Sequence, residues 1–67
     1  MQGKVRFYNQ DRRFGFIRID GWLEFFFHES RVLGADPPQP GDEVSFLLDD
    51  GRRPGELVAV DVAPIPR

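Results

Sequence analysis

The sequence predicts a small all-β domain in which five short strands close into a barrel. Three observations support this fold class. Apolar and polar residues alternate with a period of two, which is the spacing of a strand and not of a helix. Turn-forming residues separate these alternating runs at short intervals. The chain has 67 residues, which is enough for one domain with a thin core.

The first three strands are expected at residues 4–9, 14–19 and 23–28. The turn-prone run Asn9-Gln10-Asp11 ends the first strand, and Asp20-Gly21 joins the other two as a hairpin. Two further strands are expected at residues 43–49 and 56–62, on either side of a loop that begins at Asp49-Asp50-Gly51. Five antiparallel strands of this length fit a Greek-key barrel of the OB type.

The same alternation predicts which side chains fill the barrel. The inward residues are expected to be Val44, Phe46 and Leu48 in the fourth strand and Val58, Val60 and Val62 in the fifth. Residues 29–33 are too few for a stable helix, so we expect one turn, with Val32 and Leu33 closing the barrel end. Three prolines stiffen the loop at residues 34–41. Residues 1–62 are expected to form the domain and residues 63–67 a loose tail.

The second and third strands carry aromatic rings on an unexpected face. Phe14 and Phe16 share one face with Arg18, and Phe26 shares its face with Glu24 and His28. A two-sided sheet should bury its rings and leave its charges in water. Rings beside guanidinium groups suit unstacked bases and their phosphates, so we interpret this face as a binding surface. The alternative is that the rings simply belong to the core.

Several short motifs support the first interpretation. The run Arg-Arg-Phe-Gly-Phe-Ile at residues 12–17 resembles the start of a known RNA-binding signature, with Arg13 in place of the signature's first glycine. Together with residues 3–9, 25–28, Ser30 and 41–46, it resembles the bacterial cold-shock domain, an OB-fold family. The resemblance covers about residues 2–62.

The resemblance implies binding of single-stranded RNA or DNA with low sequence specificity, as in an RNA chaperone. It places Phe7 outside, in a stacking position, although alternation alone puts Phe7 beside the core residue Val5. Both hold only if a bulge interrupts the first strand near Phe7. The residues expected to bind nucleic acid are Arg6, Phe7, Arg12, Phe14, Phe16, Phe26, His28 and Arg53.

The chain also departs from the family pattern. Arg13 stands where the family has glycine, and Glu29 replaces an aromatic residue after the histidine. Glu24 replaces an aspartate, and we expect it to pair with Arg6 across the sheet rather than to accept a hydrogen bond from a base. Phe7 stands where the family has tryptophan, and the loop at residues 34–41 is short. We therefore expect weaker binding and a footprint of about four or five nucleotides. Trp22 either extends the ring surface or covers the barrel edge.

Charge is unevenly distributed along the chain. The net charge is −2, yet residues 1–18 hold five basic residues against one acidic residue, and the remainder is acidic. A local positive field is enough to hold phosphates, although the acidic remainder should lower affinity. The acidic balance also motivates a second hypothesis, in which a degenerate cold-shock fold acts as a protein-interaction module with weak or no nucleic-acid binding.

Other function classes find little support in the sequence. There is no cysteine, which favours a cytoplasmic setting, and no apolar run approaches a membrane span. One histidine and no HExxH, Walker or Rossmann pattern argue against an enzyme, a metal site or a cofactor. We expect a monomer whose partner is single-stranded nucleic acid, with no small-molecule substrate and no membrane contact.

Overall fold

The computed structural model describes residues 1–21 and 23–66, so the two alternatives for Trp22 lie outside the described residues. The elements are β1 (Gln2–Asn9), β2 (Phe14–Asp20), β3 (Leu23–His28), the 3₁₀ turn η1 (Glu29–Arg31), β4 (Glu43–Asp50) and β5 (Leu57–Pro64). This architecture confirms the all-β prediction and the single turn expected after β3.

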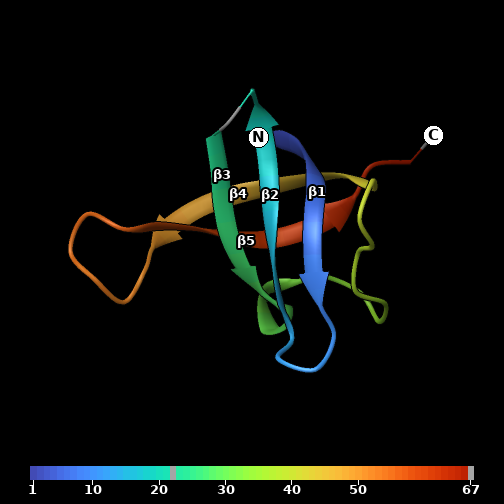
Figure 1. The fold of residues 1–67 in the computed structure, drawn as a ribbon, viewed down its shortest axis with the longest axis horizontal. Coiled ribbons are helices and arrows are strands. Elements are labelled where there is room, and N and C mark those ends of the chain that lie inside the picture. The colour runs from blue at the N-terminus through green and yellow to red at the C-terminus, as the bar shows by residue number, and fades with distance from the viewer. Residues whose placement is uncertain (22, 67) are drawn as a thin grey trace.

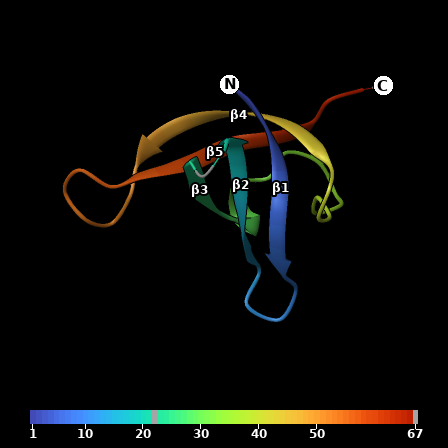
Figure 2. The same ribbon diagram turned by 45° about the horizontal axis from the view of Figure 1, so that its top comes forward.

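The strands close into a barrel in the order β1-β2-β3-β5-β4. β1, β2 and β3 lie side by side and cross the long β4–β5 hairpin steeply (Figures 1 and 2). The described pairs are antiparallel, apart from a short parallel contact between Phe26 of β3 and Val58 of β5 that closes the barrel. The five-stranded barrel predicted from the turn spacing is therefore confirmed.

The core is small and consists mainly of β-branched and aromatic side chains. Its buried cluster is Val5, Ile17, Phe27, Val44, Phe46, Ala59 and Val62, each at most 2% exposed. Tyr8, Ile19, Phe25, Val32 and Leu48 pack against this cluster. The inward direction predicted for Val44, Phe46 and Leu48 is correct.

The prediction for β5 is correct for Val60 and Val62, which are buried, but wrong for Val58. Ser45 pairs with Ala63 but Leu47 pairs with Val60, so β5 carries one extra residue against β4. The backbone of Asp61 turns into the left-handed region there, with φ of 52°. This bulge breaks the alternation, so Ala59 and Val62 join the core cluster. Val58 instead pairs with Phe26 of β3 and lines an outer groove.

Two further predictions need correction, one about the end of the barrel and one about the C-terminal tail. Val32 packs against the core and bridges to Val62, but Leu33 is 53% exposed and does not close the barrel end. β5 continues to Pro64, which pairs with Val44, so residues 63 and 64 belong to the sheet and not to a loose tail. Proline has no amide hydrogen to donate, but it is tolerated at this strand end because the next residue, Ile65, donates its amide to the Glu43 carbonyl oxygen at 3.0 Å.

Candidate nucleic-acid interface

Four phenylalanine rings form a connected patch on the outer face of β1, β2 and β3, which we call the aromatic platform. Its members are Phe7, Phe14, Phe16 and Phe26. Their ring centroids lie 5.5 to 6.5 Å apart, and Phe14 stacks on Phe26 at 5.5 Å. Phe7 is 38% exposed, the other three are half-buried, and none belongs to the core cluster. The prediction that these rings face outward is correct.

Two local features hold the platform in place. β1 pairs Val5 with Ile17 but Phe7 with Phe16, so Arg6 is an extra residue, and the bulge predicted near Phe7 is present. The bulge lets Val5 point inward while Phe7 turns outward. Gly15 lies on the inner face of β2, where a Cβ atom would come 2.8 Å from the ring of Phe27. Glycine at this position therefore lets the buried ring lie directly beneath the platform strand.

His28 lies at the end of β3, on the same face as Phe26, and is exposed. Its Nδ1 accepts a hydrogen bond from the backbone amide of Ser30 at 3.1 Å and lies 2.9 Å from Ser30 Oγ. Because Nδ1 serves as an acceptor, a neutral ring carries its proton on Nε2. The turn η1 thus fixes the ring and leaves an N–H donor for an incoming base.

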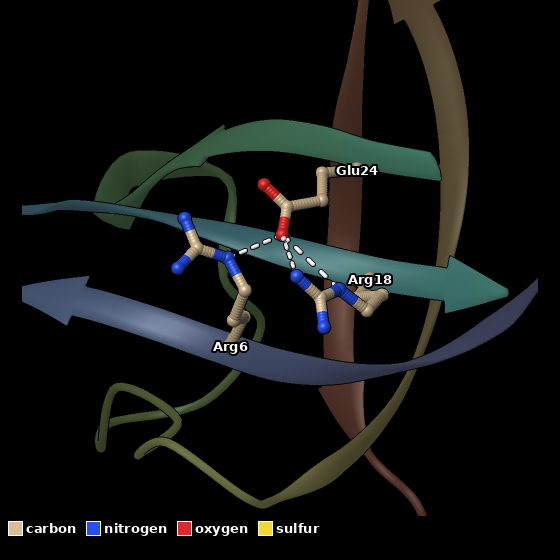
Figure 3. A network of polar contacts seen from close by, with 3 residues as sticks. All are labelled: Arg6, Arg18 and Glu24. Atoms are coloured by element: carbon tan, nitrogen blue, oxygen red, sulfur yellow. Dashed lines mark hydrogen bonds and ion pairs between the residues drawn. The ribbon is translucent and has the colours of Figure 1, made fainter. Parts of the chain in front are cut away.

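Beyond the rings, the outer face carries a charged triad. One carboxylate oxygen of Glu24 on β3 binds the Nε atom of Arg6 on β1. The same oxygen accepts from Arg18 on β2, at 3.2 Å from Nε and 2.9 Å from the terminal nitrogen (Figure 3). The expected pairing of Glu24 with Arg6 is therefore present, and Arg18 is a partner that the sequence did not reveal. Glu24 neutralises part of the positive charge that was expected to meet phosphates.

An open groove of about 800 Å³ continues from the platform toward the β4–β5 loop. Phe14, Phe26 and His28 form its platform side, and Arg12, Arg31 and Arg52 also line it. Within the described part of the chain these three arginines make no ion pair. Arg12 was predicted to contact nucleic acid, whereas Arg31 and Arg52 were missed because nothing in the sequence distinguishes them from solvated surface residues.

Arg53 is placed differently from its neighbour Arg52. Its side chain is exposed and is not part of the groove wall, while its carbonyl oxygen accepts a hydrogen bond from the Glu56 amide at 3.1 Å. The structure therefore brings together Phe7, Phe14, Phe16, Phe26, His28 and Arg12 but leaves Arg53 outside this group.

The two departures Arg13 and Glu29 are neighbours in space. Arg13 adopts φ of 61°, so the position does need the conformation that glycine accepts without strain. Two backbone hydrogen bonds hold Arg13 in this conformation. The Arg13 amide donates to the Asn9 carbonyl oxygen at 2.7 Å, and the Arg13 carbonyl oxygen accepts from the Glu29 amide at 2.8 Å. The side chains of Arg13 and Glu29 pair at 3.5 Å. Glu29 therefore pairs with Arg13 instead of adding a ring to the platform.

Tyr8 on β1 packs against the core cluster. Its ring stacks on the buried Phe27 at 6.0 Å. Burial raises the pKa of the Tyr8 hydroxyl, the negative charge of the Glu29 carboxylate raises it further, and the positive charge of Arg13 lowers it. Tyr8 is thus a neutral structural residue at neutral pH.

Among residues 1–21 and 23–66, no group of three or more histidine, cysteine or carboxylate side chains is placed to hold a metal ion. No helix in this part of the chain is long and apolar enough to cross a membrane.

Comparison with known proteins gives a consistent result. The family model described as the 'Cold-shock' DNA-binding domain matches residues 1–65. The chain is 38% identical over 55 residues to the cold shock-like protein CspE of Bacillus anthracis, which covers 79% of this chain and 82% of the relative. It is 40% identical over 53 residues to the cold shock-like protein CspD of Bacillus cereus, covering 76% and 80%.

A solved structure, Drosophila Unr CSD456, superposes with a TM-score of 0.76 at 27% identity and covers 97% of this chain. The chain spans 26% of that longer protein chain. A closed five-stranded barrel with rings on the outer face of its second and third strands defines an OB-fold domain of the nucleic-acid-binding class. Within that class, the chain belongs to the cold-shock domain family.

Proposed function

We propose that the chain binds single-stranded RNA or DNA with low sequence specificity by stacking bases on the aromatic platform. The observation that carries this proposal is the connected patch of four outward phenylalanine rings. Stacking on a ring is tolerant of sequence because every base presents a flat face. A strand bound in this way cannot pair with another strand, which supports a role like that of an RNA chaperone.

The charges around the platform favour a strand of limited length. Arg12 lies beside the rings without an ion pair to any described residue, whereas Arg6 is held by Glu24. Glu29 supplies no further ring at the end of β3. With fewer free cations and fewer rings than the family pattern, the protein should make fewer contacts along a bound strand. We therefore expect a footprint of about four or five nucleotides and an affinity that falls steeply with salt.

The test is a titration of oligo-dT, oligo-U and a mixed strand at two salt concentrations, followed by fluorescence polarisation of a labelled oligonucleotide. Phe16→Ala should weaken binding by about 1–3 kcal/mol while the protein stays folded. Quenching of Trp22 would be a label-free signal, although that residue lies outside the described part of the structure. Absence of binding to all three strands at low salt would refute the proposal.

A second candidate is a protein-interaction module, favoured by the acidic balance of residues 19–67 and by the Glu24 carboxylate among the outer-face arginines. It predicts a partner that remains bound after nuclease treatment and is lost on Phe16→Ala. A partner that is indifferent to substitutions on the platform would count against it.

A further inference from the structure

A row of charged side chains, which we call the charged row, lies next to the platform on the outer sheet. Phe16 of β2 pairs with platform rings on both β1 and β3. Two residues further along β2, Arg18 pairs with Lys4 of β1 and with Glu24 of β3. Directly paired residues share a face of the sheet. These three charges therefore stand on the platform's own face, roughly 7 Å beyond its rings.

The charged row holds more positive than negative charge. The bulge in β1 lets Arg6 reach the Glu24 carboxylate as well, so one carboxylate oxygen serves two guanidinium groups from β1 and β2 (Figure 3). Lys4 is exposed and makes no ion pair within the described residues. Glu43 of β4 is the Cα partner of Lys4 on its other side and offsets part of the excess. Three cations thus share a single close carboxylate.

The arginines of the charged row are free to exchange partners. The side chains of Arg6 and Arg18 are 45% and 48% exposed. An ion pair in contact with water contributes little to stability, so replacing one partner by another costs little free energy. A phosphate presents the same fork of oxygens as a carboxylate to a guanidinium group and accepts two parallel hydrogen bonds from it. A phosphate is therefore a competent substitute for the Glu24 carboxylate at Arg18.

The charged row lies where the outer sheet ends. β1 begins at Gln2 and β2 ends at Asp20, and among the described residues of the three strands no aromatic side chain lies beyond the row. An open hollow of about 310 Å³ adjoins the row, and its lining includes Gln2, Lys4, Arg18 and Glu43. A strand that leaves the platform in this direction meets charge and open space, which suit a polar end group rather than another base.

A phosphate at the end of a strand matches the charged row better than a phosphate within it. A terminal phosphomonoester carries a charge of about −1.5 to −2 at neutral pH and three acceptor oxygens. A phosphodiester carries a single charge and has two free oxygens. Because Lys4 and both arginines donate from different strands, the additional oxygen and the additional charge each find a partner.

We propose that Lys4, Arg6 and Arg18 form a site for the terminal phosphomonoester of a single-stranded nucleic acid. The bound phosphate takes the place of Glu24 at Arg18. The inference rests on the proposed single-strand binding, because bases stacked on the platform bring the end of the strand to the charged row. It adds recognition of a strand end to a surface that otherwise accepts any stretch of sequence.

The experiment compares short oligo-dT strands of equal length that carry a 5′ phosphate, a 3′ phosphate or hydroxyl groups at both ends. The methyl ester of each terminal phosphate is the matched control, because it keeps one charge at the same position and loses the other. We expect one of the two phosphorylated strands to bind about fivefold or more tightly than the hydroxyl strand at low salt, with its methyl ester losing much of that gain. The favoured end also reports the direction of the strand across the sheet.

Substitutions show whether the charged row is responsible. Arg18→Gln should abolish the preference for the phosphorylated end, and Lys4→Gln should reduce it, because each removes a donor to the phosphate. Arg53→Gln is the matched control, since it removes the same charge from an exposed residue that belongs to neither the platform nor the row. That variant should leave the ratio of the two affinities unchanged.

The possible failures are distinguishable. Tight binding of oligo-dT that neither terminal phosphate improves, or a preference that survives Arg18→Gln, overturns the site and leaves the platform model standing. Equal loss of the preference in Arg53→Gln and Arg18→Gln would show a general effect of net charge and would overturn the site as well. If no strand binds at low salt, both proposals fall together.

Discussion

Phe26 and Phe27 are neighbours in the chain but serve opposite sides of the same strand. Phe27 is fully buried between Tyr8, Gly15 and the rest of the core, whereas Phe26 is half-buried in the outer platform beside Phe14 and Phe16. The residue type is the same, so the period of the strand alone decides which ring stabilises the fold and which faces solvent. The comparison predicts that the two faces can be impaired separately.

The largest expected effect follows truncation of the inner ring. Phe27→Ala should cost about 3–5 kcal/mol of unfolding free energy, because it leaves a cavity in a core of few residues. That cost is comparable to the whole stability of so small a domain, so the variant should be largely unfolded. Phe26→Ala is the matched control and should stay folded while losing affinity for oligo-dT. Equal losses of stability in urea titrations of the two variants would remove the distinction between the faces.

Removing the Glu24 charge from the outer face should change nucleic-acid affinity more than it changes the stability of the fold. Glu24→Gln removes the carboxylate that holds Arg6 and Arg18, so both guanidinium groups become free to meet phosphates. We expect roughly two- to fivefold tighter binding of oligo-dT at low salt, with a smaller gain at high salt. The loss of stability should stay within about 1 kcal/mol, since both arginine side chains are about half exposed to solvent. Weaker binding would instead show that Glu24 itself contacts a base.

Arg13 lies in the loop between β1 and β2, and its backbone is strained at φ of 61°. Arg13→Gly should stabilise the protein by up to about 1 kcal/mol, because glycine adopts positive φ without the steric cost that arginine bears. The gain is limited by the greater freedom of glycine in the unfolded chain and by loss of the exposed pair with Glu29. Thermal unfolding would measure it, and a lower melting temperature would contradict this account of the loop.

The smallest expected effect concerns the inner face at high pH. The pKa of Tyr8 is raised in the folded state above its ordinary value of 10.0, so the neutral hydroxyl is favoured by folding. Its contribution to stability is therefore complete below pH 10.0 and is lost as pH rises through the folded pKa. Tyr8 is the only tyrosine, so ultraviolet absorbance reports its ionisation directly. Tyr8→Phe should be less sensitive to alkali, and an equal alkaline decline in both proteins would argue against this role.

Much of the fold was predictable because the alternation and turn residues are local signals. The strands of the hairpin around Asp20-Gly21 and the inward faces of β3 and β4 follow from period and turn chemistry alone. The register of β5 was not predictable, because it depends on a left-handed residue, Asp61, within a run of alternating valines. The bulge at Arg6 was predicted only because the family resemblance required Phe7 to face outward.

For the candidate site, too, the residues predicted from the sequence are those that local signals reveal. Phe14, Phe16 and Phe26 were predicted correctly because their spacing is visible in the sequence. Phe14 and Phe16 are two residues apart on one strand, and Phe26 pairs with Phe16 across the hairpin. Arg18 was placed on the correct face, but its ion pair with Glu24 was not predicted. Arg31 and Arg52 were missed because they meet at the groove only when β3 and β5 become neighbours in the closed barrel. Pairing of β3 with β5 joins segments more than thirty positions apart, at Phe26 and Val58, and no local pattern signals it.

The most direct test of the outward platform is to follow the aromatic side-chain NMR signals while oligo-dT is added. The platform model predicts that the ring signals of Phe7, Phe14, Phe16 and Phe26 shift strongly, because stacked bases impose ring currents on them. The rings of Phe27 and Phe46, which are buried beneath, should shift little. Saturable binding that leaves the four platform rings unmoved would contradict the central claim.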